Sequence, residues 1–119
     1  MSKSNFKSTY SLEQRQEESQ KVLTKYPDRL PVIVEKQTTA TINNIDKTKY
    51  LVPSDLTMGQ LIHIIRKRIK LKASEAIFVF VNNSIPCTSN TIAQIYEKGK
   101  DEDGFLYVTY ANENTFGSQ

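Results

Sequence analysis

The residue types that most often perform chemistry are sparse in this chain, which has one histidine and one cysteine in 119 residues. His63 has no second histidine or cysteine at metal-ligand spacing, which favours a partly exposed helix residue. Cys87 has no neighbouring histidine to act as a base, so a small buried or half-buried thiol is favoured over a nucleophile. Asp101, Glu102 and Asp103 precede a glycine but lack the spacing of a calcium loop, which predicts a solvated turn. The sequence therefore indicates neither an enzyme nor a metal site.

The largest charge feature is the basic run from Arg66 to Lys72, in a chain of net charge +3. Cations in the last turn of a helix complement its dipole, so a solvated helix end is the favoured interpretation, with contacts to acidic peptides next. Binding of the phosphates of nucleic acid or of anionic lipid is a third possibility. It is opposed by the modest net charge and by the absence of aromatic residues within the run.

Composition is that of one ordinary soluble domain, with 38% hydrophobic and 24% charged residues. A single cysteine excludes an intrachain disulfide and fits a reducing compartment. The first residues contain no apolar segment typical of a signal peptide, and the longest apolar run, 76–81, is too short to span a bilayer. We therefore expect a cytoplasmic protein.

The first 26 residues are polar and predict a weakly amphipathic helix. Ser11 and Gln14 have the spacing of a capping box at its start, and a shorter helical turn is possible over 4–9. Pro27 ends this segment. A helix of this kind packs late, onto a domain that is otherwise complete.

Beyond Pro27 the pattern changes to strands and helices that build a core. The strands are predicted at 29–35, 49–53, 77–81 and 105–110, and the helices at 57–69 and from about 90 to 99.

Three details refine this pattern. Pro53, together with lysines beside 49–53, marks an edge strand, whereas bulky residues on both faces mark 105–110 as a central strand. Thr57 and Gln60 form a second capping box, and Leu61, Ile64, Ile65 and Ile69 form the apolar stripe of the central helix. The predicted fold class is therefore α+β, a β-grasp with a four-stranded mixed sheet around 57–69.

Several blocks of sequence together resemble one known family, the GABARAP and light-chain-type ubiquitin-like autophagy modifiers. The blocks are 29–36, 45–47, 49–53, 65–68, 103–110 and 113–117, in the family's order and covering essentially the whole chain. The resemblance implies an N-terminal helical extension over 1–27, a ubiquitin-like domain over 28–111 and a flexible conjugation tail over 112–119.

The resemblance also implies that the chain is a substrate of enzymes. A cysteine protease would cleave after Phe116-Gly117 and remove Ser118 and Gln119. Ubiquitin-like activating and conjugating enzymes would then join the Gly117 carboxylate to phosphatidylethanolamine, with no other cofactor. Glycine has no Cβ, so it passes through narrow enzyme channels that a larger residue would block. The lipidated form would lie on the autophagosomal membrane, and the unconjugated form is expected to be a monomer.

The second implied activity is binding of aromatic-x-x-aliphatic peptides, from cargo receptors and adaptors, as an added strand beside the predicted edge. By family position, the aromatic pocket comprises Glu18, Val22, Pro31, Ile33, Lys49, Leu51 and Phe105. The aliphatic pocket comprises Tyr50, Val52, Pro53, Leu56, Leu61 and Ile64. The cations expected to meet acidic flanks are Arg29, Lys47, Lys49 and Arg68. From the residues alone, most of these apolar side chains would be interpreted as core.

The chain departs from the family pattern at a few positions. Leu61 and His63 stand where aromatic residues are frequent, and Cys87 stands where a second proline is common. The alternative function is an unconjugated trafficking or cytoskeletal adaptor that uses the same groove.

Overall fold

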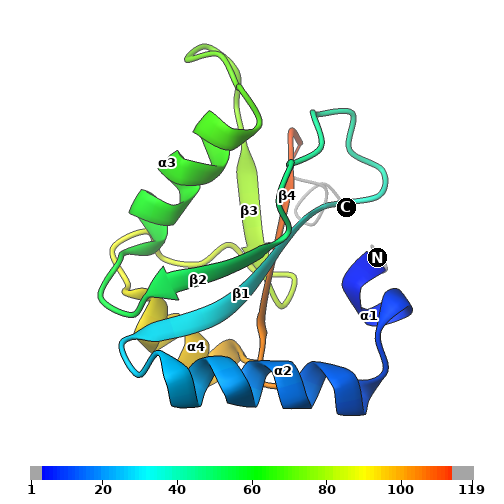
Figure 1. Cartoon of the computed structure of the whole chain (residues 1–119). Helices are drawn as coiled ribbons and strands as arrows, with labels where there is room; N and C mark the ends of the chain where they lie inside the picture. Colours follow the sequence, from blue (N-terminus) through cyan, green and yellow to red (C-terminus); the bar gives the residue numbers. More distant parts are fainter. Residues whose placement is uncertain (1–3, 114–119) are drawn as a thin grey trace.

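The computed structural model of the chain describes residues 4–113. Its elements are α1 (Asn5–Thr9), α2 (Leu12–Lys25), β1 (Arg29–Lys36), β2 (Lys49–Pro53), α3 (Met58–Arg68), β3 (Phe78–Val81), α4 (Ile92–Gly99) and β4 (Leu106–Ala111). Figure 1 shows α3 on one side of the sheet and the N-terminal helices α1 and α2 on the other. The predicted β-grasp arrangement is confirmed.

The sheet has the strand order β2-β1-β4-β3. The terminal strands β1 and β4 pair in parallel at its centre, and β2 and β3 are added antiparallel to them. Both predictions about strand position are confirmed, because β2 is an edge strand and β4 lies between β1 and β3.

One face of the sheet forms the main hydrophobic core beneath α3 and α4. Alternate residues of the central strands, including Val32, Val34, Leu106 and Val108, are fully buried there. They pack against the helix residues Met58, Leu61, Ile65, Ile92 and Ile95. Burial of these apolar side chains stabilises this face.

The opposite face of the sheet is covered by the N-terminal helices. Ile33 and Phe105 are fully buried on this face although they lie outside the main core cluster. The Phe6 ring of α1 packs edge-on against Phe105, with centroids 5.1 Å apart. The helical extension therefore contributes an aromatic side chain to a layer separate from the core.

Local sequence signals correctly predict where α2 and α3 begin. The capping boxes at Ser11 and Thr57 are present as predicted, each with its glutamine returning a hydrogen bond. A third box at Thr91 was not predicted, and it makes α4 begin at Ile92 rather than at about residue 90. The prediction that Ile64 belongs to the apolar stripe of α3 is wrong, because this residue is 38% exposed and lies outside the core.

The acidic turn 101–103 is the clearest correction to the sequence analysis, because Asp103 is only 1% exposed. Its Oδ2 accepts hydrogen bonds of 2.6 Å from both the Arg15 guanidinium and the Tyr107 hydroxyl. Its Oδ1 accepts the Phe105 N–H at 2.8 Å. The carboxylate is thus fully partnered, which is what makes its burial tolerable.

Neighbouring contacts attach both N-terminal helices to the same turn. The Ser19 hydroxyl of α2 donates to the Asp103 carbonyl at 2.5 Å, and Lys7 of α1 pairs with Asp101 at 2.6 Å. We call Lys7, Arg15, Ser19, Asp101, Asp103 and Tyr107 the polar clasp. The turn predicted to be solvated is therefore the anchor of the helical extension.

The prediction of a buried or half-buried Cys87 is also wrong, because this residue is exposed. Its thiol lies 3.1 Å from the Ser89 hydroxyl, and this hydrogen bond lowers the pKa of the thiol. His63 is exposed on α3, as expected.

Candidate functional site

The outer edge of β2 is the first part of the candidate site. Tyr50 and Val52 are paired with Val32 and Leu30 of β1, and the hydrogen bond from Val34 N–H to the Thr48 carbonyl fixes the alternation. In an antiparallel ladder the intervening residues point their backbone groups away from the partner strand. Lys49 and Leu51 therefore direct their N–H and C=O groups outward, where another strand can pair.

This edge is partly capped by a side chain. The Arg29 guanidinium donates to the Leu51 carbonyl at 3.2 Å, so one of the outward acceptors already has a partner. Pro53 has no N–H to donate. An added strand must therefore pair chiefly with Lys49 and Leu51 N–H, and it competes with Arg29 for the carbonyl.

The residues predicted for the aromatic pocket come together on the face covered by α2. Pro31 lies opposite Leu51, and Ile33 lies opposite Lys49, so all four share one face of the β1-β2 pair. Pro31, Ile33 and Phe105 are buried, whereas Val22 of α2 and Leu51 are half-buried. Buried apolar groups thus form the floor of this region, and half-buried ones form its rim.

Lys49 and Glu18 form an ion pair across this rim, joining β2 to α2. Both side chains are about two-fifths exposed, at 43% and 40%. A pair this exposed contributes little to stability, because water screens it. It is easily exchanged for a contact with another acidic group.

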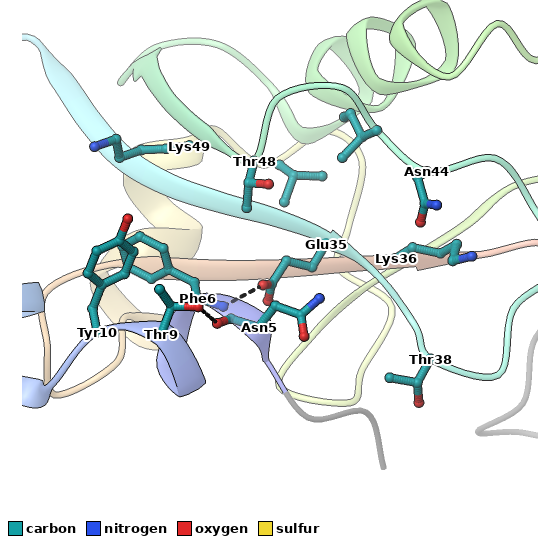
Figure 2. Close-up of a pocket in the computed structure, with 12 residues that line it drawn as sticks. Asn5, Phe6, Thr9, Tyr10, Glu35, Lys36, Thr38, Asn44, Thr48 and Lys49 are labelled. Atoms are coloured by element: carbon teal, nitrogen blue, oxygen red, sulfur yellow. Dashed lines mark hydrogen bonds between the residues drawn. The ribbon is translucent and has the colours of Figure 1, made fainter.

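A recess of about 540 Å³ continues the site beyond the start of β2. Figure 2 shows Lys49 and Thr48 on one side of it and, on the other, Phe6 of α1 and Tyr10, which follows that helix. The Phe6 N–H donates to Glu35 at 3.0 Å, which fixes α1 against β1. No residue of α1 belongs to the site predicted from the sequence, where the one signal for this segment is the aromatic content of 6–10.

Tyr50 and Val52, predicted for the aliphatic pocket, point to the α3 side of β2, whereas Pro53 alternates onto the same face as Leu51. Val52 and Leu61 are buried at 4% and 1% exposure and belong to the main core. Tyr50 and Leu56 are half-buried against that core, Pro53 is half-buried, and Ile64 is exposed. Ile64 is therefore the residue of this set with the most apolar surface available to a ligand.

The four predicted cations surround the same edge. Lys47 lies 5.3 Å from the centroid of the Tyr50 ring, and the Arg68 guanidinium lies 5.6 Å from it. Arg68 also pairs with Asp46 at 3.2 Å. Burial raises the pKa of the Tyr50 hydroxyl, so this ring stays neutral between its two cations.

Phe116, Gly117, Ser118 and Gln119 lie outside the described residues. None of the helices within 4–113 is long and apolar enough to cross a membrane, and those residues contain no cluster of metal-ligating side chains.

A four-stranded β-grasp sheet that carries two N-terminal helices defines a ubiquitin-like protein with a helical extension. The family model described as autophagy protein Atg8, ubiquitin-like, matches residues 14–117. The chain therefore belongs to the Atg8 family. It is a ubiquitin-like modifier of autophagy and not an enzyme.

Two plant relatives match over nearly full length. The chain is 57% identical to autophagy-related protein 8c of Arabidopsis thaliana, covering 98% of each chain. It is 56% identical to autophagy-related protein 8B of Oryza sativa subsp. indica, again covering 98% of each.

Two solved structures share the fold. Trypanosoma brucei ATG8 superposes with a TM-score of 0.87 at 46% identity, covering 92% of this chain and 94% of that one. Plasmodium falciparum Atg8, in complex with a peptide of Plasmodium falciparum Atg3, superposes with a TM-score of 0.86 at 34% identity. That match covers 93% of this chain and 98% of the Plasmodium chain.

Proposed function

We propose that this modifier is cleaved after Gly117 and conjugated through it to phosphatidylethanolamine, which places it on the autophagosomal membrane. The observation that carries the proposal is the family match, which continues through residue 117 and leaves Ser118 and Gln119 beyond it. Two acyl chains are sufficient to anchor a domain stably at a membrane. Before conjugation the chain is cytoplasmic.

Intact mass spectrometry tests this proposal in one experiment. After incubation with cell extract, the soluble chain is expected to lose Ser118 and Gln119, and the membrane fraction to gain one phosphatidylethanolamine. Gly117→Ala should block both changes, because a Cβ obstructs the narrow enzyme channels. Ser118→Ala is the matched control and should be processed normally. Recovery of only the full-length mass from membranes would exclude conjugation and favour the unconjugated adaptor.

The same fold supports a second activity, capture of an extended peptide along β2. The outward N–H groups of Lys49 and Leu51 supply main-chain pairing, and the apolar sets on the two faces supply side-chain specificity. The Plasmodium relative was solved with a peptide of Atg3. The proposed partners are the processing protease, the activating and conjugating enzymes, and cargo receptors or adaptors with an aromatic-x-x-aliphatic segment and acidic flanks.

Two exposed isoleucines allow a matched test of the peptide site. Ile64 is 38% exposed on α3, and Ile85 is 55% exposed in the loop after β3. Ile64→Ala should weaken binding of an aromatic-x-x-aliphatic peptide by roughly fivefold in calorimetry, because a contact at the interface is lost. Ile85→Ala should leave the affinity unchanged. Equal affinities for both variants would remove Ile64 from the site.

A further inference from the structure

Positive charge is concentrated in one short segment. Residues 66–76, which we call the basic face, contain Arg66, Lys67, Arg68, Lys70 and Lys72 against the single carboxylate Glu75. Their formal net charge is +4, whereas that of the whole chain is +3. The rest of the molecule therefore carries a net charge of −1, and the positive character of the chain belongs to this segment alone.

The loop after α3, which carries Lys70 and Lys72 of the basic face, lies beside the end of β4. A recess of about 410 Å³ is lined by Leu71, Glu75 and Ala76 on one side and by Asn112, just after β4, on another. The Asn112 amide donates to Thr41 at 2.9 Å, which holds the end of β4 at this position. Figure 1 shows that α2 and α4 lie at the opposite end of the molecule from the end of β4.

The lysines of this face are available to a ligand. Lys67, Lys70 and Lys72 are exposed, and among residues 4–113 none of the three forms an ion pair. Arg68 is paired with Asp46. Arg66 donates to the Lys72 carbonyl at 2.8 Å, which ties the segment after α3 back onto the helix. The three lysines are thus presented from a backbone that is held in place.

The length of the tail limits which surface a conjugated chain can turn toward a membrane. Gly117 lies four residues beyond Glu113, so the chain between them spans at most about 14 Å when fully extended. The folded body measures 40 × 29 × 27 Å. Because this tether is shorter than every dimension of the body, the headgroups must lie close to the end of β4.

We propose that the basic face binds anionic lipid headgroups and orients the conjugated protein on the membrane. This proposal rests on the lipid conjugation proposed above. Each lysine near an anionic leaflet adds a modest attraction that decays within a Debye length. Such a weak surface suffices here, because the tether raises the effective concentration of headgroups around it.

The test uses chemical coupling, so that it does not depend on the cellular enzymes. A chain with Cys87→Ser and Ser118→Cys is coupled to maleimide phosphatidylethanolamine and placed on vesicles of phosphatidylcholine, with or without about 30% phosphatidylserine. Hydrogen exchange is followed over the backbone amides of 66–76. These amides should exchange roughly threefold more slowly on the anionic vesicles. Failure of enzymatic processing at Gly117 would leave this measurement intact.

Variants with neutral side chains identify which lysines slow the hydrogen exchange on anionic vesicles. Lys67→Gln, Lys70→Asn and Lys72→Gln are combined, with asparagine at 70 because that residue has φ 58°, where asparagine is well tolerated. The matched control combines Lys21→Gln, Lys25→Gln and Lys98→Gln, which remove the same charge from α2 and α4. The first variant should lose the protection of 66–76 from hydrogen exchange on anionic vesicles, and the control should keep it. Lys72→Gln alone should lose part of it, which keeps the test decisive if the triple variant melts early.

Three results would overturn the proposal. They are equal exchange on neutral and anionic vesicles, protection over α2 or α4 in place of 66–76, and protection that survives in the triple variant. Binding of the free chain to a single-stranded oligonucleotide through the same lysines, without protection on anionic vesicles, would assign the basic face to nucleic acid instead.

Discussion

The two faces of the sheet are stabilised in different ways. The face under α3 and α4 is a continuous apolar cluster that includes Val32, Ile65 and Leu106. The face under α1 and α2 has one aromatic layer and is fastened at the polar clasp, where Asp103 holds Arg15 and Tyr107. Apolar burial is non-directional, whereas a hydrogen-bonded carboxylate depends on every partner. The ubiquitin-like core and its helical extension can therefore be weakened separately.

The largest expected effect is on the core face. Ile65→Ala should lower the free energy of unfolding by about 2–5 kcal/mol, because the side chain is 1% exposed and its removal leaves a cavity. Urea denaturation followed by circular dichroism measures this loss. Every probe, including those on α2, should shift together. A transition confined to the helical extension would contradict the division between the two faces.

The next effect is on the polar clasp. Asp103→Ala leaves the Arg15 guanidinium, the Tyr107 hydroxyl and the Phe105 N–H without their acceptor. We expect a loss of about 2–3 kcal/mol, because unpaired buried polar groups are costly. Hydrogen exchange should accelerate first in α2 and only later in α3. The control Asp103→Asn preserves an acceptor oxygen and should lose less. Simultaneous opening of both helices would show that the faces are coupled.

Alkaline pH tests a buried hydroxyl on the core face. Burial raises the pKa of Tyr110 from 10.0 to about 12, and its hydroxyl donates to the Asn43 carbonyl at 2.8 Å. The Tyr110 hydroxyl ionises at a lower pH in the unfolded chain than in the folded one. The stabilisation by its neutral form is therefore fully present below pH 10 and is lost as the pH rises from 10 to about 12. The free energy of unfolding should fall over this interval by roughly 2–3 kcal/mol, which melting temperatures measured at each pH report. In Tyr110→Phe the fall should be smaller.

The smallest effect concerns α1. Lys7→Ala removes the contact with Asp101, whose pKa is lowered by the Lys7 hydrogen bond despite an opposing desolvation effect. Because Lys7 is 40% exposed, the cost should be below about 1 kcal/mol. Exchange of the α1 amides should accelerate while the melting temperature stays unchanged. Lys21→Ala, on the exposed side of α2, is the control. A large fall in melting temperature would show that α1 supports the core.

Much of the fold was predictable, because its signals are local. Capping boxes at Ser11 and Thr57, the proline at the end of β2 and the apolar stripe of α3 each act within a few residues. The burial of Asp103 was not predictable, because its partner Arg15 lies 88 residues away. No local pattern distinguishes a carboxylate that will meet an arginine from one that remains in water.

The candidate site was predictable to a smaller extent. The open edge follows from Pro53 and the lysines near it, but assigning residues to two pockets required the family resemblance. The capping of the Leu51 carbonyl by Arg29 depends on the register of β1 and β2, which the sequence does not contain. The packing of Phe6 against Phe105 likewise depends on where α1 returns to the sheet.

The parallel pairing of β1 with β4 has a consequence for how the protein is made. The register joins Lys36 to Tyr110, so the central pair of the sheet unites the beginning and the end of the domain. Contacts of such long sequence separation form slowly, because loop closure precedes any gain from pairing. During synthesis, the apolar residues of β1 must wait for β4 to emerge from the ribosome. Completion of the fold therefore requires almost the whole domain to be synthesised first.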